Sequence, residues 1–245
     1  MRLHRFYIEG NIGGKTEVNV EQKALLNQLR NVFRLKSGDN LVLFDGSGSD
    51  FVCRITDISK ERAALHIKEV VASKYMPMRK ISLYASVIKK DKFEWIVEKA
   101  TELGVSDIIP ILSDRSEKKD VNMDRLNKIA VEAGEQCGRG NVPIIHPVET
   151  LDTLISQVAL EGATRDSGYN AVFHTDADIL PRSGLGTKIK PLNMSDIGIF
   201  IGPEGGWTDR EIAMFRDANI DIRGLGRQIL RAETAAIVAL SLFCF

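Results

Sequence analysis

One stretch constrains the fold more than any other, because a strand, a bare loop and a helix start follow one another within it. The run Ile197–Ile201 is continuously apolar, as in a strand buried on both faces of a parallel sheet. The loop Gly202–Gly206 contains three glycines, which leave the backbone open to a ligand. Thr208 and Glu211 then have the spacing of a helix-starting capping box. This order predicts an α/β fold with a ligand site beyond the strand's carboxyl end, although a tight turn alone would also use glycines.

The ligand of this loop is predicted to be a neutral or cationic small molecule. The chain contains no G-x-x-x-x-G-K-[ST] motif and no G-x-G-x-x-G motif after a strand, so both common nucleotide-phosphate fingerprints are absent. Glu204, in the middle of the loop, would also repel an anion.

The chain is predicted to have two domains with different patterns. Residues 1–72 contain short strands and one helix near Gln22–Val32, a pattern typical of a small β-barrel. A linker with a proline follows at Ser73–Arg79. In the second domain, residues 73–245, strands and helices alternate, which predicts a parallel sheet covered by helices on both faces.

The charge distribution indicates where a nucleic acid could bind. The chain has 33 basic and 33 acidic residues, a balance that weakly disfavours nucleic-acid binding. However, residues 1–125 carry 22 Lys and Arg against 18 Asp and Glu, whereas residues 126–245 carry 11 against 15. A nucleic-acid-binding face is therefore expected mainly in the first half.

Cysteine count and hydropathy predict a cytoplasmic protein without a metal. The three cysteines, Cys53, Cys137 and Cys244, are too few and too scattered for a disulfide framework or a zinc site. No signal peptide is expected at the N-terminus. The apolar stretch Ala235–Phe245 is too short to span a bilayer, so no membrane association is expected.

A second unusual stretch covers residues 224–243. Gly224 and Gly226 again free the backbone after a strand, and Arg231 and Glu233 precede an alanine-rich helix. The positive dipole end of that helix would face the same side of the sheet as the first glycine loop. Taken singly, each of these residues also fits an ordinary first helical turn.

Together, the two stretches closely resemble the ribosomal RNA small subunit methyltransferase E family, whose members are SPOUT-class enzymes. The resemblance extends over essentially the whole chain, with its motifs in one order. The matching motifs are LVLFDGS at 41–47, KKDKFEWIVEKATELGV at 89–105, EQCGR at 135–139, IGPEGGWTDRE at 201–211 and LGRQILRAETA at 225–235.

The resemblance implies a fold, a reaction and a cofactor. Members of this family have a small PUA-like RNA-binding β-barrel followed by a SPOUT parallel-sheet domain with a C-terminal trefoil knot. They methylate N3 of a uridine in 16S rRNA with S-adenosylmethionine, which the knot holds on three loops, here Phe173–Ala177, Ile201–Gly206 and Leu225–Ala235. The implied cofactor-binding residues are Phe173, His174, Ile201, Gly202, Pro203, Glu204, Gly205, Gly206, Leu225, Gly226, Ile229, Leu230, Thr234 and Ala235.

The resemblance also implies partners. The substrate is 16S rRNA or the small ribosomal subunit, and the helix Ala235–Phe245 is expected to be the face of a homodimer. The residues implied to bind RNA are Arg5, Arg30, Arg34, Lys89, Lys90 and Arg139. The chain departs from the family pattern at Gln28 and Asn141, where the family often has histidine and arginine, and both departures touch the expected RNA surface.

The catalytic candidates follow from the chemistry of this reaction. Uracil N3 must lose its proton, and the negative charge then spreads onto O2 and O4, where a fixed cation would stabilise it. Arg231 is the predicted catalytic cation, and Glu233 is predicted to orient Arg231 or the cofactor. The proton acceptor is not assigned, although Glu204 is one candidate.

Several alternatives stay open from the sequence. Cys137 could be a nucleophile, but attack by N3 needs no cysteine adduct. Trp207 could stack on a base or pack in the core, and His174 could be purely structural. The whole chain could also act on another RNA or base position, or be a catalytically silent RNA-binding assembly factor.

Overall fold

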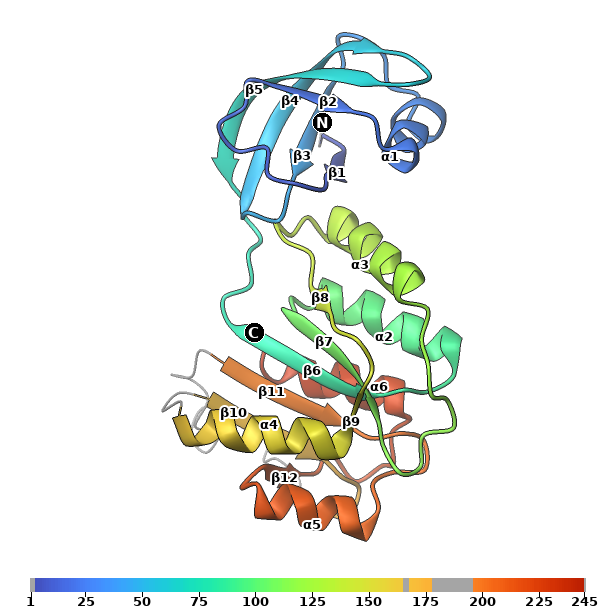
Figure 1. Ribbon diagram of the computed structural model, residues 1–245, viewed down its shortest axis with the longest axis vertical. Coiled ribbons are helices and arrows are strands. Elements are labelled where there is room, and N and C mark those ends of the chain that lie inside the picture. Colours follow the sequence, from blue (N-terminus) through green and yellow to red (C-terminus); the bar gives the residue numbers. More distant parts are fainter. Residues whose placement is uncertain (1–2, 165–167, 178–195, 245) are drawn as a thin grey trace. The chain divides into compact units, whose positions relative to one another are not determined.

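The chain forms two compact units (Figure 1). The computed structural model describes residues 3–164, 168–177 and 196–244. Unit 1 comprises Met1–Met76 and Gly134–Val142, and unit 2 comprises Pro77–Ala133 and Pro143–Phe245. The expected boundary after residue 72 falls at the end of the last strand of unit 1. The sequence pattern did not indicate that the chain returns to unit 1 at residues 134–142.

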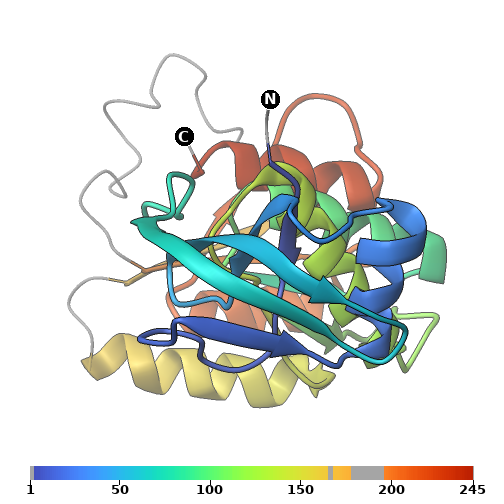
Figure 2. The same cartoon turned by 90° about the horizontal axis from the view of Figure 1, so that it is seen from above.

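Unit 1 is built on a five-stranded sheet with the order β1-β3-β4-β5-β2. β1 pairs with β3 in parallel and the other pairs are antiparallel. Figure 2 shows that this sheet is curved. Its elements are β1 (Arg5–Tyr7), β2 (Glu17–Val20), α1 (Lys23–Asn27), a π-helical turn η1 (Gln28–Val32), β3 (Asn40–Phe44), β4 (Ser49–Ile58) and β5 (Ala63–Ala72).

The core of unit 1 follows from side-chain alternation along its strands. In β2, Val18 and Val20 are buried while their neighbours are exposed, because successive side chains of a strand point to opposite faces. Phe6 and Phe51 are fully buried in the same cluster, together with Leu29 of η1. The helical segment that was predicted at Gln22–Val32 is therefore found as α1 and η1, and it contributes to this core.

Segment 134–142 completes unit 1 through specific polar contacts. Its first residues are the last turn of α3 (Met123–Cys137). Glu135 Oε1 accepts a hydrogen bond from the backbone N–H of Tyr7 at 2.9 Å. Arg5 forms an ion pair with Asp50 and donates from Nη2 to the carbonyl oxygen of Arg139 at 3.1 Å. Unit 1 is thus assembled from two pieces of chain that are distant in sequence.

Unit 2 contains a parallel sheet with the order β12-β10-β11-β6-β7-β8, and β9 also pairs with β7. Every pairing that the structure gives in this sheet is parallel. The strands are β6 (Lys80–Ser86), β7 (Asp107–Leu112), β8 (Ile144–Ile145), β9 (Glu149–Thr150), β10 (Gly168–Phe173), β11 (Asp196–Ile201) and β12 (Asp221–Arg223).

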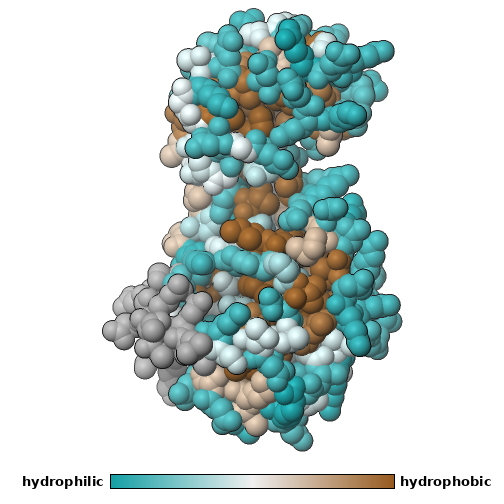
Figure 3. Space-filling view, viewed as in Figure 1, coloured by the Kyte–Doolittle hydropathy of each residue, from teal (hydrophilic) through white to brown (hydrophobic). Residues whose placement is uncertain are grey.

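Helices cover both faces of this sheet. Figures 1 and 2 show α4 (Leu151–Thr164) and α5 (Asp209–Asp217) on one face, and α2 (Lys90–Glu102) and α6 (Ala232–Ser241) on the other. On the first face Phe200 stacks on Tyr84 with ring centroids 4.3 Å apart, and meets Phe215 of α5 edge-on at 5.2 Å. Burying side chains of this size contributes about 1.5–3 kcal/mol each to the free energy of unfolding. On the side drawn in Figure 3, hydrophilic residues cover most of the periphery of unit 2.

The predicted order of a β-rich first part and a parallel α/β second part is confirmed. β11 is buried from Ile197 to Ile201, as its apolar run predicted. Within the described ranges, no helix is both long and apolar enough to cross a membrane. The trefoil knot stays a prediction.

Candidate active site

Three neighbouring strands of unit 2 end at the same level. Phe173, the last residue of β10, is the register partner of Ile201, which ends β11, and of Arg223, which ends β12. The segments that follow these strands therefore leave the sheet side by side. This edge, beyond the carboxyl ends of the strands, is where ligands bind in open parallel sheets.

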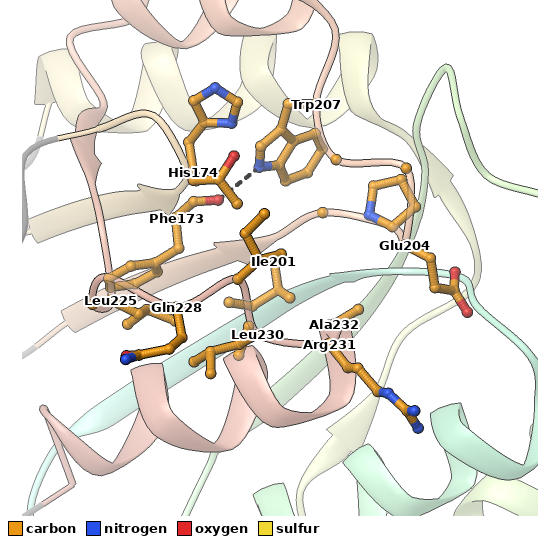
Figure 4. A pocket seen from close by; sticks show the side chains of 18 residues that line it. Phe173, His174, Ile201, Glu204, Trp207, Leu225, Gln228, Leu230, Arg231 and Ala232 are labelled. Atoms are coloured by element: carbon orange, nitrogen blue, oxygen red, sulfur yellow. Dashed lines mark hydrogen bonds between the residues drawn. The ribbon is translucent and has the colours of Figure 1, made fainter.

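A pocket of about 420 Å³ opens among these three segments (Figure 4). Its volume lies within the range of small-molecule sites. The labelled side chains of Phe173, Ile201, Leu225 and Leu230 give it apolar walls. The residues that line it are Phe173, His174, Thr175, Ile201, Gly202, Pro203, Glu204, Gly205, Gly206, Trp207, Leu225, Gly226, Gln228, Ile229, Leu230, Arg231, Ala232 and Ala235.

The structure brings together almost all of the residues that the resemblance assigned to the cofactor. All of them line the pocket except Thr234, which is exposed on the first turn of α6. Thr175, Gln228 and Ala232 also line the pocket and were not assigned. They lie within or directly beside the assigned segments, so their positions in the sequence were the available signal.

The glycine loop is tightly fitted against Trp207. A Cβ atom on Gly202 would lie 3.0 Å from the indole ring. The ring is buried, its Nε1–H donates to the carbonyl oxygen of Phe173 at 3.0 Å (dashed line in Figure 4), and it packs edge-on against Phe215 at 5.1 Å. Gly206 has φ +69°, a conformation that side chains disfavour. Trp207 is therefore a core residue that ties the end of β10 to the glycine loop, and this burial leaves no exposed face for base stacking.

The helix start after the loop is fixed by a capping box. The Thr208 side chain accepts from the backbone N–H of Glu211, and Glu211 Oε2 accepts from the backbone N–H of Thr208 at 2.7 Å. Glu211 is fully buried, and its Oε1 accepts from the backbone N–H of Asp114 at 2.8 Å. From the same segment after β7, Arg115 Nη1 donates to the carbonyl oxygen of Gly205 at 2.7 Å. The glycine loop is thus fixed at its carboxyl end.

An exposed ion-pair group extends this bracing. Arg210 donates from Nη2 to Asp114 Oδ1 at 2.7 Å and from Nη1 to Asp152 Oδ1 at 2.8 Å. Hydrogen bonds from Arg210 lower the pKa of both carboxyl groups below the ordinary aspartate value. These pairs link α5 to the segment after β7 and to α4.

The opposite wall, Leu225–Arg231, lacks such bracing. No side chain in it forms a hydrogen bond to another described residue, and Ile229 is 84% exposed. Arg231 is the N-cap residue of α6 and makes no side-chain capping bond. In Figure 4 its guanidinium group points away from the apolar centre of the pocket, toward the side where Glu204 lies.

Two carboxylates at this side share one lysine. Lys92 Nζ lies 3.5 Å from Glu233 Oε1 and 4.0 Å from Glu204 Oε1. Glu233 does not line the pocket, and the structure pairs it with Lys92 rather than with Arg231.

The six residues expected to bind RNA fall into two groups. Four are exposed or half-buried, namely Arg30, Arg34, Lys89 and Lys90. The other two have largely covered side chains: that of Arg5 is 9% exposed and pairs with Asp50, and Arg139, only 3% exposed, donates from Nε to Asn141 Oδ1 at 3.1 Å. Arg5 and Arg139 therefore hold unit 1 together. The sequence analysis expected both to bind RNA, but their guanidinium groups are turned toward other residues of unit 1.

The remaining candidates also have defined surroundings. Cys137 ends α3 in unit 1 and does not line the pocket. The backbone N–H of His174 donates to the carbonyl oxygen of Arg223 at 2.9 Å, which fixes the start of the first pocket segment. Among the residues that the structure describes, no group of three or more His, Cys, Asp or Glu side chains could hold a metal ion.

Family models match both units. A model described as RNA methyltransferase domain matches residues 74–244, and one described as RNA methyltransferase PUA domain matches residues 29–68. The first match contains all three segments around the pocket.

Individual relatives match along nearly the whole chain. "Ribosomal RNA small subunit methyltransferase E" of Rickettsia conorii is 30% identical over 242 residues, covering 98% of this chain and 95% of that protein. The protein of the same name from Bacillus subtilis is 30% identical over 88% of this chain and 85% of its own length. The crystal structure of ribosomal RNA small subunit methyltransferase E of Neisseria gonorrhoeae, bound to S-adenosyl methionine, has a TM-score of 0.84 at 27% identity and covers 98% of this chain and 96% of its own. On these matches, the chain belongs to the ribosomal RNA small subunit methyltransferase E family.

Proposed function

We propose that this protein uses S-adenosylmethionine to methylate N3 of a uridine in the 16S rRNA of the small ribosomal subunit. The observation that carries the proposal is that all three segments that the family resemblance assigns to the cofactor line one pocket. The relative from Neisseria gonorrhoeae, solved with S-adenosyl methionine, supports the choice of ligand.

The pocket suits this cofactor chemically. Its apolar walls can bury an adenine ring, and the glycine loop offers backbone groups for ribose and adenine hydrogen bonds. Glu204 lines the same pocket, and a carboxylate favours a cationic ligand over an anionic one. When bound, S-adenosylmethionine supplies an activated methyl group, so this chain's residues need only align the base and manage its charge.

Arg231 is the proposed catalytic residue. It lies at the rim of the pocket, at the N-terminus of α6, where the helix dipole adds to its positive charge. A guanidinium at this position could donate to O2 and O4 of uracil as the charge of the deprotonated N3 spreads onto them. Glu233 follows two residues later and is proposed to act on Arg231 indirectly, through its pairing with Lys92.

RNA binding is proposed to use both units. Arg30 and Arg34 in unit 1, and Lys89 and Lys90 at the start of α2, keep their charges accessible for phosphate contacts. We further propose a cytoplasmic homodimer that associates partly through α6. Ile237 and Val238 on that helix remain half-buried in the single chain, which leaves apolar surface for a partner copy.

The decisive experiment is methyl transfer to purified 16S rRNA and to small ribosomal subunits, with the modified nucleotide located by mass spectrometry. The expected product is 3-methyluridine at one position, missing from rRNA of cells that lack the protein. A methyl group on another RNA or another atom would support a different methyltransferase. Absence of S-adenosylmethionine binding would instead favour the silent assembly factor.

A further inference from the structure

One lysine of the run at residues 89–92 is half-buried. Lys89 and Lys90 are exposed, whereas the side chain of Lys92 is only 26% exposed. Its Nζ contacts Glu233 at 3.5 Å and Glu204 at 4.0 Å. The charge of Lys92 is therefore directed toward these two carboxylates of unit 2.

The two carboxylates come from different segments of unit 2. Glu204 belongs to the braced glycine loop, whereas Glu233 lies in the first turn of α6, two residues after Arg231. α2, which carries Lys92, packs along α6. Lys92 thus connects α2 to the glycine loop and to the first turn of α6, which lie on either side of Arg231.

The charges of this cluster are unbalanced without the lysine. The Glu233 side chain is 15% exposed, and its Oε2 is buried without a hydrogen-bond partner among the described residues. Neither carboxylate forms an ion pair with another described cation. Removing Lys92 would leave both carboxylates uncompensated, which destabilises the fold, although less than in a fully buried pair because all three side chains keep some contact with solvent.

We propose that Lys92 is a positioning residue for methyl transfer. It holds the turn that bears Arg231 against the glycine loop, and it neutralises carboxylates that would otherwise repel the negative charge developing on uracil. This inference rests on the proposed function and adds to it a residue that does not itself line the pocket.

The test compares Lys92→Met with Lys99→Met. Lys99 lies on the same helix, also between two glutamates, with its Nζ 2.8 Å from both Glu98 and Glu102, but at the helix end away from the pocket. Single-turnover methyl transfer to rRNA at saturating cofactor is expected to slow roughly ten- to a hundredfold in Lys92→Met, because small misplacements of reacting groups cost factors of this size. Cofactor affinity should change less than about threefold. Lys99→Met should keep the wild-type rate.

Two further variants separate positioning from simple packing. Lys92→Arg should recover part of the rate, since it restores the charge. Lys92→Met combined with Glu233→Gln should be no slower than Lys92→Met alone, because both substitutions remove one pair. A wild-type rate in Lys92→Met, or losses that multiply in the double variant, would overturn the proposal.

Thermal unfolding keeps the inference testable independently of activity. Lys92→Met should lower the Tm more than Lys99→Met does, and adding Glu233→Gln should restore part of that loss. If wild-type protein methylates no rRNA, the proposed function fails, whereas the pattern of Tm values still decides whether Lys92 compensates Glu233. Equal Tm values for the two lysine variants would contradict that compensation.

Discussion

The two walls of the pocket differ in how they are held. The glycine loop is fixed by a buried indole, an arginine bonded to its backbone and a capping box. The wall Leu225–Arg231 has no side-chain hydrogen bond to another described residue and exposes Ile229. The first wall is therefore shaped before any ligand arrives, whereas the second has side chains free to respond to one.

This difference suggests a division of labour within one pocket. A braced wall keeps its shape and so suits recognition of a small cofactor, since preorganisation lowers the entropy cost of binding. A wall with free polar side chains suits a substrate that comes and goes. Substitutions in the first wall should therefore change cofactor affinity, whereas substitution of Arg231, the proposed catalytic residue of the second wall, should change turnover.

The largest expected effect tests the second wall. Arg231→Ala should slow methyl transfer by about a hundredfold or more, because it removes a donor that acts mainly in the transition state. Arg231→Lys should recover only part of the rate, since an ammonium lacks the forked geometry of guanidinium. Single-turnover kinetics and calorimetric cofactor affinity check this prediction. A variant that fails only because it no longer binds S-adenosylmethionine would break the comparison.

The next effect tests the first wall. Gly202→Val should weaken cofactor binding roughly ten- to a hundredfold, because its side chain would press on the fixed indole of Trp207. Gly168→Val is the matched control, because Gly168 begins β10 and does not line this pocket, and a Cβ there meets no atom within 4 Å. Calorimetry should find near-wild-type affinity for the control. Equal losses in both variants would mean that the fit of the glycine loop against Trp207 does not control cofactor binding.

A smaller effect measures the bracing itself. Trp207→Phe keeps an aromatic ring but leaves the carbonyl oxygen of Phe173 without its donor, and should lower the free energy of unfolding by about 1–3 kcal/mol. Trp95→Phe is the control, because Trp95 lies on α2 and is 40% exposed. Denaturant unfolding should detect less than about 0.5 kcal/mol for the control. If Trp207→Phe proved as stable as the control, the bond to Phe173 would not brace the loop.

The smallest effect depends on pH. The pKa values of Asp114 and Asp152 are lowered by Arg210, so these carboxylates stabilise the fold above the ordinary aspartate pKa of about 3.9, and the contribution is lost as the pH falls through the lowered values. Arg210→Met should therefore have a slightly lower Tm than wild type at pH 7. The difference should vanish in acid, and a difference that grew toward low pH would refute this assignment.

The sequence predicted the parts of the site that depend on local signals. The capping box at Thr208 and Glu211 needs residues only three positions apart, and the burial of β11 follows from its own apolar run. The three pocket segments lie together because the parallel strands β10, β11 and β12, which precede them, end at the same edge of the sheet. The strands β8 and β9 have two residues each, too few to produce a recognisable pattern.

What the sequence did not predict depends on distant partners. Arg139 carries the same charge as Arg34, yet it is buried in a segment whose carbonyl oxygen, that of Arg139, accepts a hydrogen bond from Arg5, 134 positions away. Lys92 turns inward because α2 packs on α6, a contact that no periodicity of α2 alone reveals. A single tryptophan after a glycine loop is equally compatible with stacking or burial, and only the position of Phe173 decides between them.

The return of residues 134–142 to unit 1 has a consequence for how the chain is made. Synthesis proceeds from the N-terminus, and domains commonly fold in that order as they emerge. Here the sheet of residues 5–72 emerges well before Glu135 and Arg139, whose atoms complete the bonds to Tyr7 and Arg5. The first unit must therefore wait, with part of its edge unsatisfied, until more than half of the chain has been synthesised. Cutting the chain after residue 72 would leave the first product without residues 134–142, and the second product would carry that segment without the sheet that it contacts.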